Sequence, residues 1–208
     1  MSDQPQVLNG PWRPHGRPSR LAIGILRLFG WTVRSPGLPV GIEQGVVLVY
    51  PHTSNWDFPL GVLAKWALGF ELRFWAKDSL FRVPLLGRWL RFIGGVSVDR
   101  SSAHGLVGDT VRQMQAAREA GRPFWLIAAP EGTRSLTSGW RTGAYQVALQ
   151  AGVPLALAYF DFKTRTVGLE RFLRLTGDMA TDFAAFAAYY AGRTGKRPEL
   201  ASPIQPRT

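Results

Sequence analysis

The run Gln44-Gly-Val-Val-Leu-Val-Tyr50 is mainly apolar, and Pro51-His-Thr-Ser-Asn-Trp-Asp57 separates it from a second apolar stretch, Phe58–Phe70. A short apolar run that ends at turn residues is typical of a buried strand. The second stretch favours a buried helix, because Pro59 falls in its first turn and Asp57 at its positive end. A strand, a polar loop and a helix in this order predict the first unit of an α/β fold.

The same alternation continues along the chain. Further strands are predicted at Glu71–Ala76, Val96–Asp99, Phe124–Ala129, Val153–Tyr159 and Thr164–Leu169. Further helices are predicted from Ser101 or Ser102 to Ala120, over Thr142–Ala151 and over Asp178–Ala191. Strands that alternate with helices predict a single-domain αβ sandwich with a mixed, largely parallel sheet, preceded here by an N-terminal amphipathic helix.

Composition restricts the function classes. The chain has 208 residues, of which 46% are hydrophobic and 19% charged, so it is expected to fold rather than to be disordered. It contains no cysteine, which excludes a disulfide framework, a thiolate zinc site and cysteine nucleophilic catalysis. The formal net charge of +11 predicts an anionic partner. The accompanying eight Trp and twelve Phe suit a membrane interface or single-stranded nucleic acid equally well.

Residues 1–37 are predicted to be distinct from the main domain, residues 38–208. Residues 1–20 are rich in Pro, Gly and Arg and predict a loose basic tail. Leu21–Val33 is apolar, but Arg27 interrupts it and it is too short to span a bilayer, which takes about 20 residues. On a helix its basic and apolar residues would lie on opposite faces, as in helices that contact a membrane surface. A helix that packs on its own core with its arginines in solvent is the alternative.

A histidine and an aspartate follow the first predicted strand, in His52-Thr-Ser-Asn-Trp-Asp57. With His52 on the loop and Asp57 on the first helical turn, the two side chains can converge where α/β sheets commonly hold ligands. An aspartate that accepts from one imidazole nitrogen leaves the other free as a base. Since the pair has no obvious serine or cysteine partner, that base would deprotonate an alcohol of a substrate. A structural pair that ties the loop to the helix is the alternative.

Three further groups of residues suit a phosphate. Glu131-Gly-Thr-Arg134 follows a predicted strand, and its Thr and Arg can donate to phosphate, although a solvated turn is the alternative. Arg100 follows Asp99 at a strand end, where it would face the same crevice or form only a surface ion pair. Lys77 is a candidate phosphate contact or interfacial anchor, with a snorkelling side chain as the alternative.

The order and spacing of these groups resemble the glycerolipid acyltransferase (PlsC-like) family over about Val46 to Tyr159, which is more than half the chain. His52-x4-Asp57 is similar to the family's H-x4-D block, and Glu131-Gly-Thr-Arg134 matches its E-G-T-R block. The other blocks are similar at Ala76-Lys77 with Leu80-Phe81, Pro84 and Gly87, at Gly94-Gly95 with Asp99-Arg100, and at Val153-Pro154.

The resemblance implies transfer of a fatty acyl group from acyl-CoA or acyl-carrier protein to a hydroxyl of a lysophospholipid. Lysophosphatidic acid is the default acceptor, and an acylated amino acid lipid is an alternative. His52 would be the general base and Asp57 would orient it. The remaining residues are implied to bind substrate: Arg100, Arg134 and Lys77 at the acceptor phosphate, Gly132 and Thr133 around it, and Glu131 beside Arg134 or the acceptor. No metal or cofactor is expected, and the apolar stretches 58–70 and 80–93 would shelter the acyl chain.

The expected partners are an anionic membrane surface, the thioester donor and the lysophospholipid. The expected location is the cytoplasmic face of the inner membrane, with peripheral or monotopic attachment. A nucleic-acid-binding module is one alternative, but the aromatic residues lie in apolar runs and no familiar nucleic-acid motif occurs, so no nucleic acid is expected. A non-catalytic lipid carrier on the same fold is another, against which the intact His52 and Asp57 argue.

Overall fold

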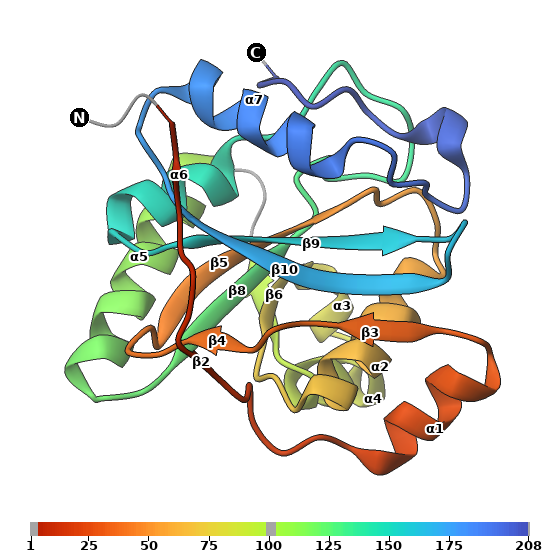
Figure 1. Cartoon of the computed structure of the whole chain (residues 1–208). Helices are drawn as coiled ribbons and strands as arrows, with labels where there is room; N and C mark the ends of the chain where they lie inside the picture. Colours follow the sequence, from red (N-terminus) through yellow and green to blue (C-terminus); the bar gives the residue numbers. More distant parts are fainter. Residues whose placement is uncertain (1–3, 99–102, 208) are drawn as a thin grey trace.

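The structure, a computed structural model, describes residues 4–98 and 103–207. Its centre is an eight-stranded sheet in the order β1-β10-β9-β5-β8-β6-β7, with β3 also paired to β10 (Figure 1). The strands from β9 to β7 in this order run parallel, whereas β10 is antiparallel to both β9 and β1. The predicted mixed, largely parallel sheet is therefore confirmed. Its strands are β1 (Gln6–Val7), β3 (Thr32–Arg34), β5 (Gln44–Tyr50), β6 (Arg73–Lys77), β7 (Gly95–Val98), β8 (Phe124–Ala128), β9 (Leu155–Asp161) and β10 (Thr166–Arg174).

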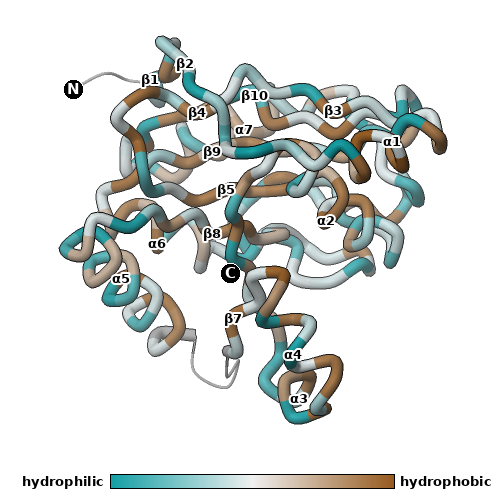
Figure 2. Tube along the Cα trace, turned by 90° about the horizontal axis from the view of Figure 1, so that it is seen from below, coloured by the Kyte–Doolittle hydropathy of each residue, from teal (hydrophilic) through white to brown (hydrophobic). Residues whose placement is uncertain are grey.

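Helices cover both faces of the sheet (Figures 1 and 2). One face packs against α5 (Ala103–Glu119), α6 (Gly143–Ala151) and α7 (Met179–Tyr190). The other packs against α1 (Arg20–Leu28) and α2 (Asp57–Leu68). Two short helices, α3 (Asp78–Phe81) and α4 (Pro84–Phe92), project at one edge beside β7 (Figure 2). The remaining elements are β2 (Trp12–Arg13), which pairs with β4 (Leu38–Pro39), and a 3-10 turn at Pro198–Leu200.

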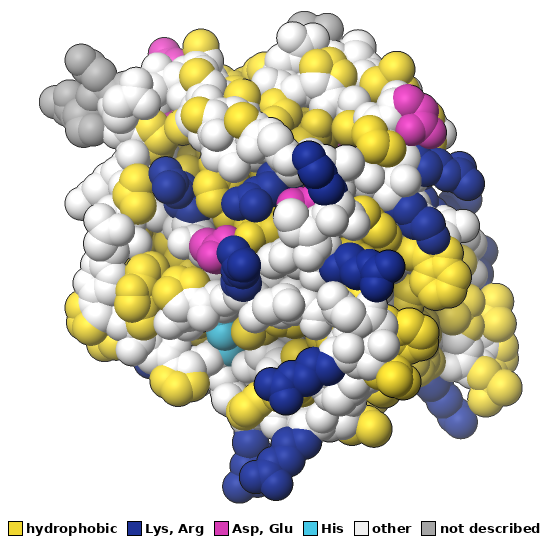
Figure 3. Space-filling view, turned by 45° about the vertical axis from the view of Figure 1, so that its right-hand side comes forward, with side chains coloured by type: hydrophobic (Ala, Val, Ile, Leu, Met, Phe, Trp, Pro, Cys, Tyr) yellow, Lys and Arg dark blue, Asp and Glu magenta, His cyan; other side chains and the backbone are white. Residues whose placement is uncertain are grey.

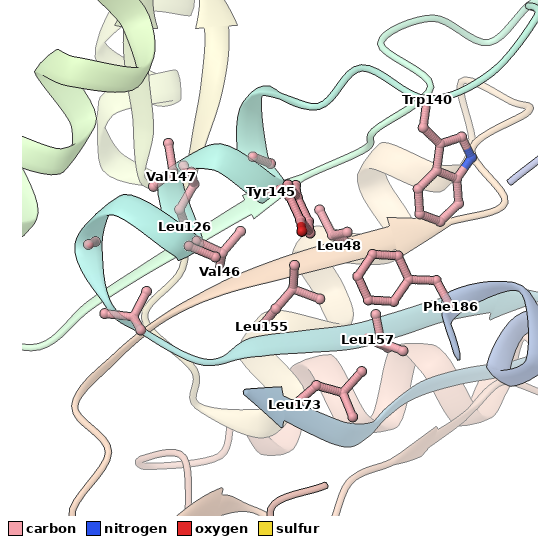
Figure 4. Packing of buried hydrophobic residues seen from close by; sticks show 14 of the residues in the cluster. Val46, Leu48, Leu126, Trp140, Tyr145, Val147, Leu155, Leu157, Leu173 and Phe186 are labelled. Carbon is pink, nitrogen blue, oxygen red and sulfur yellow. The ribbon is translucent and has the colours of Figure 1, made fainter. Parts of the chain in front are cut away.

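Strand β5 is buried along its whole length, as its sequence predicts. Its side chains alternate between two cores, because successive residues of a strand point to opposite faces. Val46 and Leu48 join the core that includes Phe186 and Trp140 (Figure 4). Val47 and Val49 join the core under α1 and α2. Burial on both faces is the physical reason for the unbroken apolar run.

The N-terminal residues depart from the predictions. A loose tail is wrong for residues 4–20, because β1 pairs with β10 and β2 pairs with β4. The predicted helix over Leu21–Val33 ends at Leu28, Gly30 adopts a φ of +71°, and the chain then forms β3 beside β10. The N-terminal helix itself is confirmed, with one face buried and Leu21 and Leu28 exposed. The division of the chain at residue 37 stays a prediction.

His15 shows how closely this N-terminal segment is packed. Its Nε2 lies 2.7 Å from Ser35 Oγ, and its ring centroid lies 4.5 Å from that of Phe70. Burial, and to a lesser degree the charge of Arg13, lowers the pKa of His15 to about 4. Between pH 6.5 and about 4, the imidazole is therefore neutral in the folded protein, whereas it becomes protonated in the unfolded chain.

We predict that the free energy of unfolding falls as the pH is lowered from 6.5 towards about 4, because only the unfolded chain takes up a proton at His15 in this range. In His15→Phe the fall is expected to be smaller. Urea denaturation at both ends of this window, with wild type beside the variant, measures the difference. An equal fall in both proteins would contradict a neutral, buried His15.

Candidate functional site

The candidate site forms where two neighbouring strands end. Strands β5 and β8 pair in parallel, with Leu48 opposite Ala128. Their carboxyl ends therefore meet at one edge of the sheet, the usual place for ligands in α/β folds. The loop after β5 carries His52, and the loop after β8 carries Glu131. Residues that lie 79 positions apart in the sequence are thus brought into contact.

His52 and Asp57 converge as the sequence predicts. Asp57 is the first residue of α2, its side chain is fully buried, and its Oδ2 lies 3.1 Å from His52 Nδ1. The same carboxylate oxygen accepts a hydrogen bond of 2.9 Å from the backbone N–H of Ser54, which fixes its orientation. His52 retains 18% exposure and lines a cavity. Nε2 is therefore the ring nitrogen available to a bound molecule, which a purely structural pair does not require.

Glu131 links the two loops from within. Its carboxylate is buried, with Oε2 accepting 2.6 Å from the N–H of His52 and Oε1 accepting 2.9 Å from the N–H of Ser202. Burial raises the pKa of Glu131, and the hydrogen bonds from Ser202 and His52 act in the opposite direction. Glu131 does not line the cavity. The geometry places its carboxylate as a support of the His52 backbone. A position beside Arg134 or the acceptor, which the resemblance implies, stays a prediction.

The other predicted substrate-binding residues gather around the cavity, which has a volume of about 1530 Å³. Gly132, Thr133 and Arg134 line it together with His52, and Lys77 lines it from the end of β6. Arg100 lies outside the described residues. Lys and Arg side chains gather on the side of the molecule where β9 ends (Figure 3). With Asp57, the structure thus brings six of the predicted site residues to one cavity.

Sequence reasoning missed three cations that line the same cavity: Lys65, Arg141 and Arg207. Arg141 lies against Gly132, where an added Cβ would come within 2.8 Å of its Nε, and Gly132 has a φ of +68° that also favours glycine. The position of Arg141 at the end of the E-G-T-R loop was a possible signal. Arg207 has no local signal, because only the path of the folded chain brings it here.

The rest of the cavity is largely apolar. Phe58 of α2 packs edge-on against Phe74 and Trp89, and all three rings line the space. Lys65 lies at its apolar part, where its Nζ donates to the carbonyl oxygens of Leu72 and Ile93. Burial lowers the pKa of Lys65, and the charge of Glu71 opposes this. Phe58 and Trp89 belong to the two stretches predicted to shelter an acyl chain, whereas Phe74 lies between them on β6.

Two further properties hold for the part of the chain that the structure describes. Its His, Asp and Glu side chains form no group of three or more that could hold a metal ion. Its helices include none of the length and apolarity needed to cross a membrane.

Residues 32–158 match the family model of the Acyltransferase family. The chain belongs to this family. The match includes the loops that carry His52 and Glu131 and both strands that position them. Strand β10, helix α7 and the C-terminal residues lie beyond it.

Named relatives point the same way. The chain is 31% identical over 101 residues to the 1-acyl-sn-glycerol-3-phosphate acyltransferase of Escherichia coli (strain K12). The aligned region covers 46% of this chain and 39% of that protein. The chain is 32% identical over 85 residues to the enzyme of the same name from Saccharomyces cerevisiae. That aligned region covers 38% of this chain and 27% of the yeast protein. The matches thus span less than half the length of these curated relatives.

A solved structure agrees in fold. The crystal structure of the 1-acyl-sn-glycerophosphate acyltransferase PlsC from Thermotoga maritima superposes with a TM-score of 0.52 at 18% identity. The similarity covers 83% of this chain and 74% of that one. It supports the same overall architecture over most of this chain.

We predict that Glu131→Gln lowers the free energy of unfolding by about 1–3 kcal/mol, because an amide cannot accept from both backbone N–H groups and leaves a buried donor unpaired. Urea denaturation measures the change, and hydrogen exchange at the His52 amide reports the loosened contact. Glu119→Gln, at an exposed position on α5, is the control and should alter neither. Equal stability of wild type and Glu131→Gln would contradict the bridging role.

Proposed function

We propose that this protein transfers a fatty acyl group from acyl-CoA or acyl-carrier protein to a hydroxyl of a lysophospholipid, with lysophosphatidic acid as the default acceptor. The observation that carries the proposal is the His52–Asp57 pair at a cavity that is lined by both cations and apolar side chains. The names of the relatives support the acceptor type.

The chemistry follows from the pair. Nε2 of His52 takes the proton of the acceptor hydroxyl as its oxygen attacks the thioester carbonyl carbon. Asp57, 3.1 Å from Nδ1, stabilises the imidazolium that forms. The tetrahedral intermediate then collapses with cleavage of the C–S bond, and the imidazolium gives its proton to the departing thiolate. Neither a covalent enzyme intermediate nor a cofactor enters this sequence.

The cavity suits both ends of a lysophospholipid. Arg134, with Gly132 and Thr133 beside it, supplies donors for a phosphate, since a guanidinium can bind phosphate through two hydrogen bonds. The rings of Phe58 and Trp89 form walls for an acyl chain. An acylated amino acid lipid remains the alternative acceptor within the same reaction. A non-catalytic lipid carrier needs no base at the cavity, so the partly exposed His52 ring that lines it favours an enzyme.

We predict that His52→Ala lowers kcat by roughly 10²-fold or more, the usual loss on removing a general base. Thiol release from acyl-CoA and from acyl-carrier protein, with and without lysophosphatidic acid, measures this loss. Asp57→Asn keeps the shape of the pair and should lower kcat while the acceptor KM changes little. Thermal unfolding of each variant checks that the fold is intact. Acceptor-dependent turnover that survives in His52→Ala would refute the mechanism.

We further propose that the protein acts on an anionic membrane surface at the cytoplasmic face of the inner membrane, where the thioester donors are found. Helix α4 supports this proposal in addition to α1. Leu85 and Phe92 are 81% and 79% exposed, and the cations of Arg88 and Arg91 stand beside them. Apolar and hydrophilic positions alternate along this projecting helix (Figure 2). Such a surface suits headgroups and the acyl boundary together. Trp89 connects it to the cavity.

We predict that Phe92→Glu lowers binding to vesicles of phosphatidylcholine and phosphatidylglycerol by roughly tenfold, because it removes an exposed aromatic ring that would insert into the vesicle surface and adds a charge that anionic lipid repels. Co-sedimentation with the vesicles measures the bound fraction. Val40→Glu is the matched control, since Val40 is 55% exposed but follows β4 instead of lying on α4. Equal losses in the two variants, or no loss in either, would refute α4 as a contact surface.

A further inference from the structure

The C-terminal residues 193–207, here called the strap, run across both loops of the site. The family match ends at residue 158, well before them. The N–H of Arg197 donates to Thr53 Oγ1 on the His52 loop. In Figure 1 the blue end of the chain runs beside the green loop that follows β8. The strap is thus in a position to shape the site from outside the family's motif region.

Ser202 is the central contact of the strap and is fully buried. Its N–H donates to Glu131, and its carbonyl oxygen accepts 3.2 Å from the hydroxyl of Tyr50 at the end of β5. Its Oγ accepts from the N–H of Thr137 at 3.1 Å. One residue of the strap therefore bonds to the end of β5, to the E-G-T-R motif and to the loop after it.

Further hydrogen bonds fix the last residues of the strap along that loop. The N–H of Trp140 donates to Gln205 O, and the N–H of Arg207 donates to Trp140 O, both at 2.8 Å. Gly139 has no room for a side chain, because an added Cβ would lie 2.5 Å from Gln205 O. This pairing places Arg207 next to Arg141, and both side chains line the cavity with Arg134.

We propose that the strap completes the acceptor site, and that Arg141 and Arg207 bind the anionic headgroup together with Arg134. The proposal rests on the proposed acyl transfer and specifies how its acceptor is held. Among the described residues, the four ion pairs include none of these three arginines, so their charges are available to a ligand. Guanidinium groups from two chain segments can surround a phosphate monoester, which carries close to two negative charges.

The same chemistry could serve the phosphates of acyl-CoA, and the positions of the arginines favour the acceptor. Arg141 lies against Gly132 of the E-G-T-R loop, and Glu131 of that loop holds the His52 backbone. A headgroup bound there is held by the same loops that position the base. Because the acceptor hydroxyl must reach Nε2, its phosphate is the one that belongs beside these loops.

The test compares Arg207→Gln and Arg141→Gln with wild type and with Arg122→Gln. Arg122 is exposed just before β8, at the end of that strand opposite the cavity, so its variant removes the same charge elsewhere. KM is measured for lysophosphatidic acid, for monoacylglycerol, which lacks the phosphate, and for the thioester donor. Binding of glycerol 3-phosphate is measured separately by calorimetry, so that headgroup recognition is tested independently of turnover.

We expect Arg207→Gln and Arg141→Gln each to raise the KM for lysophosphatidic acid, and the Kd for glycerol 3-phosphate, by about tenfold or more. Turnover of monoacylglycerol, the donor KM and the Arg122→Gln variant should be unchanged. A raised donor KM with an unchanged acceptor KM, or an equal effect of Arg122→Gln, would overturn the assignment. Absence of turnover in wild type would defeat the proposed function alone, because the glycerol 3-phosphate titration would still decide the role of Arg207 and Arg141.

Discussion

The two carboxylate oxygens of Glu131 accept hydrogen bonds from the backbone N–H groups of His52 and Ser202, which lie far apart in the sequence. A buried carboxylate is costly unless its oxygens are hydrogen-bonded, so this contact is stable only while both segments stay in place. The same requirement fixes the backbone from which the imidazole projects. The position of the His52 imidazole therefore depends on Glu131 in the loop after β8 and on the strap, as well as on its own loop.

Helix α2 contributes residues to both the polar and the apolar lining of the cavity. Its first residue, Asp57, lies 3.1 Å from His52 Nδ1, and the next residue, Phe58, forms part of the apolar wall. Gly61, one turn further, would bring a Cβ within 3.3 Å of Phe160, so a small residue keeps the helix close to β9. The charged end and the apolar side of this one helix therefore place a polar and an apolar part of the cavity at a fixed separation.

The structure shows where part of the excess of basic residues lies. Part of it lies at the cavity, in Arg134, Arg141 and Arg207, and part lies on α4 beside exposed Leu and Phe side chains. Trp89 belongs to α4 and also lines the cavity, so both regions border the same space. A lipid that reaches the cavity across α4 would thus meet positive charge at the surface and again at the site.

The sequence by itself determined the features that depend on neighbouring residues. Strand β5 follows from an apolar run that is buried on both faces, and the approach of His52 to Asp57 follows from one loop and one helical turn. Only the tertiary structure decided the inward direction of Glu131, the place of Arg207 and the pairing of residues 32–34 with β10. Burial patterns are local and can be recognised in a sequence. These other features depend on partners more than 60 residues away, which no local pattern specifies.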